Sequence, residues 1–225
     1  SQGYYTTPLP AGTEDGVDSE KVSNFGYNLK AGGSYAIDDN HRVYANVGLY
    51  SRQPFHDNIF PQFTNQIFPL TENETIFGLE AGYSYKSQYF KGNVNLYRTS
   101  WKDRVAGSSF VDNDQVFFTT NFGVEQLHSG VEVDFIASPF SYLDFRGYVS
   151  VGDWKYKGTA TTQVKDEEQN ILSTEKEDVD GGEVGDAAQF TAGLGVKIDL
   201  SKSFSFDSDI RYYDNLHADV GAVKE

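Results

Sequence analysis

The 225-residue sequence contains neither cysteine nor methionine. Without cysteine the chain can form no disulfide framework, no thiolate metal site and no cysteine nucleophile. Without methionine the sequence has no initiator residue, and the residues that follow Ser1 do not form a signal peptide. We therefore expect a processed protein or an internal piece of a longer one.

Positive charge and long apolar runs are also scarce. Lys and Arg number 18 against 33 Asp and Glu, which gives a net charge of -15 and argues against a nucleic-acid partner. No apolar run approaches the roughly 20 residues that a membrane-spanning helix needs. The four histidines are widely separated, and the sequence has no Ser-His-Asp elbow and no phosphate-binding glycine loop. We therefore expect that the protein is not an enzyme and has neither catalytic residues nor a cofactor.

What the sequence does contain is strict alternation of apolar and polar residues. In residues 76–86 every second residue from Phe77 onward is apolar, and the residues between these are small or polar. Successive side chains of a strand point to opposite faces, so this segment predicts a strand with one apolar face. The apolar positions are Phe77, Leu79, Ala81, Tyr83 and Tyr85.

This alternation recurs about eight times, and the connections alternate between very short and long. The expected hairpins are 25–37 with 42–52, 76–86 with 90–101, 116–137 with 142–156, and 190–200 with 204–213. The expected long connections are 54–75, 102–114 and the acidic segment 157–186. Tight turns at one end and long loops at the other are typical of transmembrane β-barrels. The predicted fold is therefore all-β, with antiparallel up-and-down hairpins forming an arc of a larger barrel.

The two faces carry different chemistry. The polar face holds charges of both signs, which a water-filled lumen tolerates and a dry core does not; these are Lys30, Lys91, Arg146, Lys197 and Arg211 with Glu80, Glu132, Asp134, Asp144, Asp207 and Asp209. Aromatic residues predict two interfacial belts. One belt is expected near the turns, at Tyr85, Tyr89, Phe140, Tyr142 and Phe204, and the other near the long connections, at Tyr50, Tyr97, Trp101, Trp154, Tyr156, Tyr212 and Tyr213.

Several segments carry a family resemblance. Residues 46–55, 79–85, 93–104, 184–191 and 211–214 resemble barrel segments of TonB-dependent outer-membrane receptors. The resemblance implies a 22-stranded barrel in the outer membrane, plugged by an N-terminal domain and driven by the energy-coupling protein TonB. It also implies lipid and a nutrient ligand as partners, the nutrient being a metal chelate, a vitamin or an oligosaccharide.

The chain departs from the family pattern at both ends. It contains no plug domain and no TonB box, so any contact with TonB would run through the absent plug. Residues 223–225 lack the terminal aromatic strand with which such barrels end. We therefore expect residues 1–225 to be part of a barrel domain, an internal slice of its second half, with 157–186 as a long extracellular loop.

Two candidate sites follow from the sequence. Arg52, Gln53, Phe55 and His56 open a long loop at the expected barrel mouth and could contact a ligand, although anchoring of the loop is the favoured interpretation. Asp178 and Asp180 are weak candidates for binding Ca²⁺, since their spacing does not match a helix-loop-helix calcium site. No other metal site is expected.

Two alternative functions remain open from the sequence. One is a soluble β-rich module that binds carbohydrate or another ligand, with its apolar faces packed together in two sheets. The other is a complete, small eight-stranded outer-membrane barrel, in which the first and last strands pair with each other.

Overall fold

The computed structural model describes residues 21–60, 67–68, 71–168, 170–185 and 187–217. The expectation about residues 223–225 lies outside this range. The described residues form ten strands and one short helix, α1 (His56–Ile59), and contain no helix long and apolar enough to cross a bilayer. The strands are β1 (Asn28–Ala36), β2 (His41–Arg52), β3 (Glu74–Lys86), β4 (Phe90–Asp112), β5 (Gln115–Phe140), β6 (Leu143–Lys157), β7 (Thr159–Lys165), β8 (Ile171–Asp178), β9 (Ala188–Asp199) and β10 (Ser205–Leu216).

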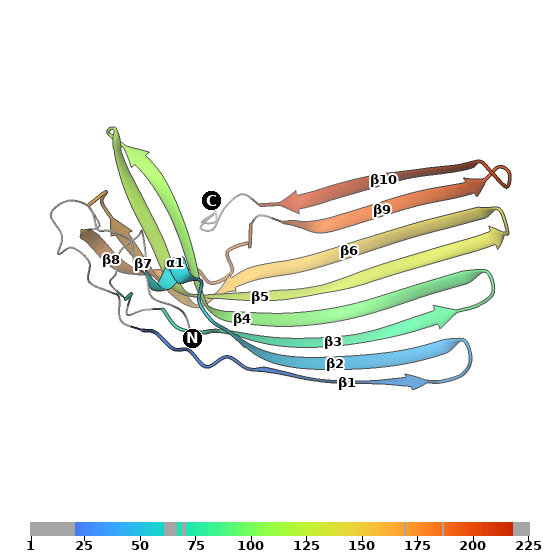
Figure 1. Cartoon of the computed structure of the whole chain (residues 1–225), viewed down its shortest axis with the longest axis horizontal. Coiled ribbons are helices and arrows are strands. Elements are labelled where there is room, and N and C mark those ends of the chain that lie inside the picture. The colour runs from blue at the N-terminus through green and yellow to red at the C-terminus, as the bar shows by residue number, and fades with distance from the viewer. Residues whose placement is uncertain (1–20, 61–66, 69–70, 169, 186, 218–225) are drawn as a thin grey trace.

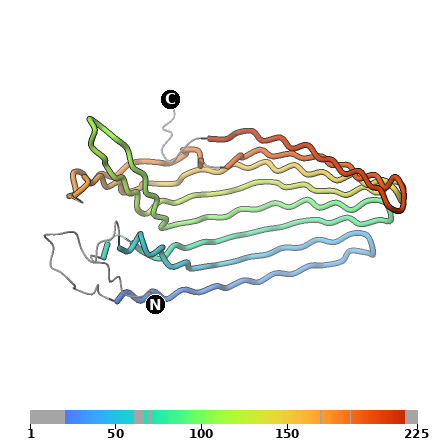
Figure 2. The backbone as a smooth tube through the Cα atoms, turned by 45° about the horizontal axis from the view of Figure 1, so that its top comes forward, coloured from blue at the N-terminus to red at the C-terminus, as the bar shows by residue number. Residues whose placement is uncertain are grey.

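All of these strands belong to one antiparallel sheet. The main path runs β1-β2-β3-β4-β5-β6-β9-β10, and β7 and β8 extend from β5. Figures 1 and 2 show the main strands lying side by side as a single curved layer. The predicted all-β, up-and-down fold is confirmed, and among the described strands the sheet is open, with β1 paired only to β2 and β10 only to β9. Neither the two-sheet module nor the closed eight-stranded barrel matches this pairing.

The four tight turns that the sequence predicts lie together at one end of the sheet, on the right of Figure 1. They join β1 to β2, β3 to β4, β5 to β6 and β9 to β10, as the sequence predicts. In the first turn the Asp38 carboxylate accepts the backbone N–H groups of Asn40 and His41, each at 2.8 Å. Such side-chain acceptors are what make aspartate a turn residue.

The strands on either side of the second long connection are much longer than expected. β4 runs to Asp112 and β5 starts at Gln115, so residues 102–114, predicted as a long loop, are strand and a tight turn. The alternation is interrupted by a bulge, with a register shift between Trp101 and Arg104 and a positive φ of 60° at Asp103. Beyond the bulge the strands pair again, and this part of the hairpin stands away from the sheet in Figure 1.

The acidic segment 157–186 also contains regular structure. It folds back as the hairpin β7–β8, and β7 pairs with β5 between Phe118 and Phe122. The acidic residues of this segment are concentrated in and around β8, where only one strand neighbour, β7, covers them.

One face of the main sheet is apolar across every strand. Backbone register places the side chains of Val43, Tyr83, Val94, Val133 and Val149 in one continuous row. None of these residues is covered by a second layer; Val149, for example, is 41% exposed. An uncovered apolar surface of this extent is what lipid-facing walls present. We call it the apolar face.

The apolar face ends in a polar row near the long connections. Arg98, Ser129 and Asp153 are neighbours in register there, and beyond them Lys102 pairs with Glu125 at 3.4 Å. Charged side chains on the outer surface mark the edge of the hydrocarbon layer, because they are costly inside it.

The opposite, polar face carries the predicted charges, and many of them are paired. Asn93 Nδ2 donates to Asp134 Oδ1 at 3.0 Å, and Asn46 Nδ2 to Glu80 Oε2 at 3.3 Å. Arg146 forms an ion pair with Asp207 on β10. The two amide contacts link neighbouring strands, and the ion pair reaches across β9 from β6 to β10, all on the face that looks into the barrel.

The belt near the turns matches the prediction. Of the belt predicted near the long connections, Tyr212 lies on the apolar face, as the register partner of Ala192, whereas other members do not. Tyr89 and Phe204 are 57% and 73% exposed at the turn end. Tyr97, Trp101 and Trp154 alternate with outward residues and therefore lie on the polar face, not on the lipid side. The prediction followed their distance along the strands and overlooked which face they occupy.

Three tyrosines of the polar face lean across glycines of the next strand. The register pairs Tyr44 with Gly82, Tyr97 with Gly130 and Tyr148 with Gly193. A Cβ added at any of these glycines would overlap the tyrosine ring. Each glycine therefore makes room for an aromatic ring that lies down on the sheet.

Candidate functional site

The end of the sheet that carries the long connections has the only buried cluster of the described residues. Val124, Tyr156, Ala160 and Val184 pack there with exposed fractions between 2% and 7%. The cluster joins β5, β6 and β7 to the segment before β9. The loop end is therefore a packed layer, and its side chains are held in defined positions.

A buried carboxylate joins the two strands that flank the first long connection. Glu74, 3% exposed at the start of β3, lies 2.9 Å from Arg52 Nε and accepts a hydrogen bond from Arg52 Nη2 at 3.1 Å. It also accepts the indole N–H of Trp101 at 2.8 Å. Arg52 further lies over the ring of Phe55, 4.5 Å from its centroid. Charge and ring contacts together fix this corner of the barrel mouth.

The contacts continue across the polar face onto β5. Arg104, just past the bulge, lies 4.2 Å from the ring centroid of Trp101 and donates to Gln126 Oε1 at 2.5 Å. Gln126 is 4% exposed, and its Oε1 also lies 3.2 Å from His128 Nε2. The bulge thus turns Arg104 toward the ring of Trp101 and the amide of Gln126.

The same row reaches β6 through stacked rings. His128 stacks on Trp154 with ring centroids 5.1 Å apart, and Trp154 Nε1 donates to the Tyr97 hydroxyl at 2.9 Å. We call the set Arg52, Glu74, Trp101, Arg104, Gln126, His128 and Trp154 the mouth cluster. It crosses β2 to β6 at the level where the apolar face ends on the other side of the sheet.

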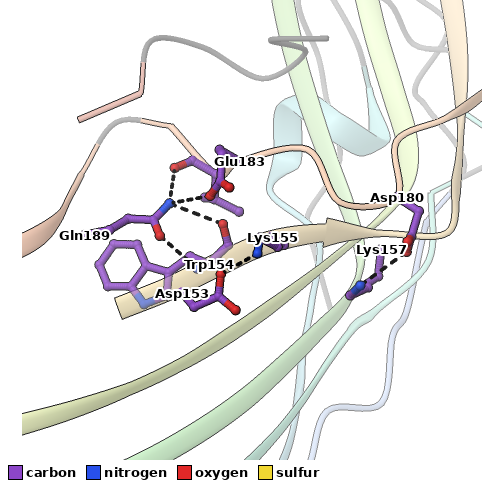
Figure 3. Close-up of polar contacts among 8 residues, drawn as sticks. Asp153, Trp154, Lys155, Lys157, Asp180, Glu183 and Gln189 are labelled. Atoms are coloured by element: carbon purple, nitrogen blue, oxygen red, sulfur yellow. Dashed lines mark hydrogen bonds and ion pairs between the residues drawn. The ribbon is translucent and has the colours of Figure 1, made fainter. Parts of the chain in front are cut away.

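Gln189 ties the start of β9 to this cluster, as Figure 3 shows. Its Oε1 accepts the Trp154 backbone N–H at 2.9 Å, while its Nε2 donates to Glu183 Oε2 at 3.1 Å and to the Trp154 carbonyl at 3.3 Å. Gln189 is 4% exposed, so the amide replaces water for each of these groups. Lys155 and Asp153, 2.7 Å apart, form an ion pair nearby.

The four residues predicted to contact a ligand at the barrel mouth differ in how far other residues of the chain engage them. Arg52 is engaged by Glu74, and Gln53 Nε2 donates to the Asn24 carbonyl at 2.7 Å, both of which fit anchoring of the loop. Phe55 is 63% exposed. His56 begins α1, with its ring 5.1 Å from that of Phe60.

The two aspartates considered for calcium belong to a turn. Asp180 Oδ1 accepts the Gly158 backbone N–H at 3.1 Å. The same oxygen lies 3.4 Å from Lys157 Nζ, a contact drawn in Figure 3. The backbone hydrogen bond and the lysine charge lower the pKa of Asp180 below its ordinary value. Asp178 accepts the Asp180 N–H at 3.0 Å. Among the described residues, no group of three or more His, Asp or Glu side chains is arranged to hold a metal ion.

Sequence reasoning missed most of the mouth cluster. Trp101, Arg104 and His128 were not recognised as parts of one site. The alternation already places Tyr97 and Trp101 on one face of β4, so their shared orientation was readable. Their partners on β3, β5 and β6 depend on register, which the alternation leaves open.

Comparison with known families agrees with this architecture. The family model described as "TonB dependent receptor-like, beta-barrel" matches residues 2–222. No curated protein and no solved structure matches the chain. An open antiparallel sheet with one apolar face, tight turns at one end and a packed loop layer at the other is what an arc of such a barrel looks like. The chain therefore belongs to the TonB-dependent receptor β-barrel family, whose members are transporters of the outer membrane and not enzymes.

Proposed function

We propose that this chain forms part of the wall of a receptor that imports a scarce nutrient, with the mouth cluster and the loops around it receiving the ligand. Residues 1–225 then belong to the barrel domain, and the acidic segment 157–186 lies outside the cell. The nutrient is a metal chelate, a vitamin or an oligosaccharide. TonB supplies the energy through a plug domain that contacts the polar face.

The observation that carries this proposal is that the middle of the strands and their ends at the long connections carry different kinds of side chain. The middle of the sheet has an apolar outer face and a hydrogen-bonded polar inner face, which suits a wall. The packed aromatic and charged groups lie at the mouth, where a ligand arrives. Phe55 is exposed and its ring contacts the Arg52 guanidinium, so it is the residue of the predicted set best placed to touch a ligand. Arg52, Gln53 and His56 lie next to it in the chain and hold this part of the loop in place.

The test is energised uptake by the full-length receptor in its host. Cells lacking the gene should lose uptake of one limiting nutrient from a panel of ferric citrate, cyanocobalamin and neutral oligosaccharides. Loss of TonB or addition of a protonophore should have the same effect. Uptake that continues in cells without TonB would overturn the proposal.

A matched pair of variants tests the mouth. Phe55→Ala should lower uptake at limiting nutrient, while Phe204→Ala, an exposed aromatic at the opposite end of the sheet, should leave it unchanged. Both proteins should reach the outer membrane in equal amounts. Equal uptake by the two variants would remove Phe55 from the ligand site.

A further inference from the structure

A pocket of about 430 Å³ lies beside the part of the β4–β5 hairpin that continues past the bulge. Its walls come from α1, from Phe68 and from the two paired strands, and the residues that line it are Asp57, Asn58, Phe68, Gly107, Ser108, Ser109, Phe118, Thr119, Thr120 and Phe122. The volume falls within the range of about 300–1,000 Å³ typical of small-molecule sites.

Aromatic rings form one part of the pocket wall, and they are fixed in place. Phe68 stacks on Phe122 with centroids 4.7 Å apart and planes 8° from parallel. Lys165 Nζ lies 4.2 Å from the Phe68 centroid. Phe118, Thr120 and Phe122 occupy every second position of β5, so their side chains lie on the same face of that strand.

Hydroxyl groups form the other part. Ser109 and Thr120 share the strand face of Phe118 and Phe122, whereas Ser108 and Thr119 belong to the opposite face and border the pocket through their backbone. Within the described part of the chain, the hydroxyls of Ser109 and Thr120 make no hydrogen bond. A hydroxyl can donate one hydrogen bond and accept two.

Charge narrows the ligand class. Among the described residues that line the pocket Asp57 is the one with a charge, and the chain as a whole carries -15. Anionic ligands such as phosphates or carboxylate chelates are recognised by Arg and Lys. The nearby Lys165 is 8% exposed and its ammonium lies over the Phe68 ring, so no described cation of the lining is presented to an anion. An uncharged ring compound with several hydroxyls satisfies both parts of the wall, because its C–H face covers an aromatic ring and its edge meets hydroxyl groups.

We propose that this pocket binds a sugar unit of a neutral oligosaccharide. The inference rests on the proposed import function and narrows its ligand to one of the three classes. The sugar ring lies against Phe118, and its hydroxyls bond to those of Ser109 and Thr120. The long β4–β5 extension, which the sequence did not predict, is then the element that carries the ligand site.

The test is calorimetric titration of the purified full-length receptor in detergent. The probes are hexamers of glucose, xylose, mannose and galactose, with hexagalacturonate and ferric citrate as anionic comparisons. At least one neutral hexamer should bind, and neither anion should compete with it. Binding of none of the neutral hexamers, or tighter binding of hexagalacturonate, would overturn the inference.

Two neighbouring phenylalanines provide a matched comparison. Phe118→Ala should weaken binding of the neutral hexamer about tenfold, which corresponds to about 1.4 kcal/mol. Phe117→Ala, which removes a ring stacked on Phe110 on the other face of the same strand, should bind as the wild type does. If Phe118→Ala does not assemble, the near-isosteric Thr120→Val should still weaken binding about threefold or more. Equal binding by the Phe118 and Phe117 variants would contradict the proposed site.

The inference and the proposed function can fail separately. If TonB-dependent uptake of ferric citrate or cyanocobalamin is found while no neutral sugar binds, the receptor function stands and the sugar site is wrong. If no probe is taken up in a TonB-dependent manner, the import function itself is wrong.

Discussion

Replacing Glu74 by alanine removes the centre of the contact between β2, β3 and β4 at the barrel mouth. Glu74 is 3% exposed and holds Arg52 at 2.9 and 3.1 Å and the Trp101 indole at 2.8 Å. Breaking a fully buried ion pair costs about 3–5 kcal/mol. The Arg52 side chain is 39% exposed, so water can hydrogen-bond to its guanidinium once the carboxylate is removed. We therefore expect a local loss of about 2–3 kcal/mol.

The loss should appear where β2 and β3 end, because the contact closes that end of the pair. Tyr50 and Ile76 are register partners there. The Ser51 amide bonds to the Tyr27 carbonyl, outside this pair, so the alternation of the antiparallel ladder gives the β2–β3 hydrogen bonds to Tyr50 and Ile76. Hydrogen exchange of their backbone amides, followed by mass spectrometry on the full-length receptor, should accelerate by a factor of about 30 to 140, since about 1.4 kcal/mol is a factor of ten. Amides near the tight turns should be unaffected.

Two further variants decide whether the reasoning is right. Glu74→Gln keeps an acceptor for Trp101 but loses the charge, so its exchange should accelerate less than that of Glu74→Ala. Glu175→Ala on the exposed strand β8 should leave the amides of β2 and β3 unchanged. Less than threefold acceleration in Glu74→Ala would refute the view that this carboxylate holds the mouth together.

Three more outcomes follow from the sheet. Val133→Arg, in the middle of the apolar face, should lower the unfolding free energy in lipid vesicles by about 2–4 kcal/mol, whereas Ser150→Arg on the polar face should change it little; equal losses would mean that the faces are assigned wrongly. Gly123→Ala should cost about 1–2 kcal/mol in the same assay because its φ is 67°, with open space around the position. Gly33→Ala, with equally open space and no positive φ, is the control and should not destabilise. The pKa of Asp38 lies below its ordinary 3.8 because backbone N–H groups bond to its carboxylate; its stabilising effect is therefore present above that pH and lost as pH falls through the lowered value, and NMR shifts of the two turn amides should titrate below pH 3.8.

The sequence predicted the wall of the barrel better than its mouth. Alternation from Phe77 to Tyr85 specifies which side chains share a face, and the apolar face then fixes the orientation of the whole strand. Turn residues such as Asp38 mark the short connections. These features are local, so they can be read without knowing the fold.

The extended hairpin and the β7–β8 pair were not predictable by the same route. At Asp103 a non-glycine residue takes a positive φ, and nothing in the residue type announces it. Beyond it, serines and glycine at 107–109 read as a loop, although backbone pairing with β5 makes them strand. In β8 a run of charged residues obscures the alternation. The mouth cluster depends on the register across these same strands.

The tyrosines that lie over glycines also have a consequence for the width of the receptor's bore. A ring folded down onto the neighbouring strand takes up far less of the interior than one standing upright, and the absence of a Cβ at Gly82, Gly130 and Gly193 is what allows this posture. A side chain at any of the three would push its tyrosine upright, away from the sheet and into the barrel interior. A glycine and the tyrosine that covers it therefore depend on each other. In related receptors, a larger residue at the glycine position should be accompanied by a smaller residue at the tyrosine position.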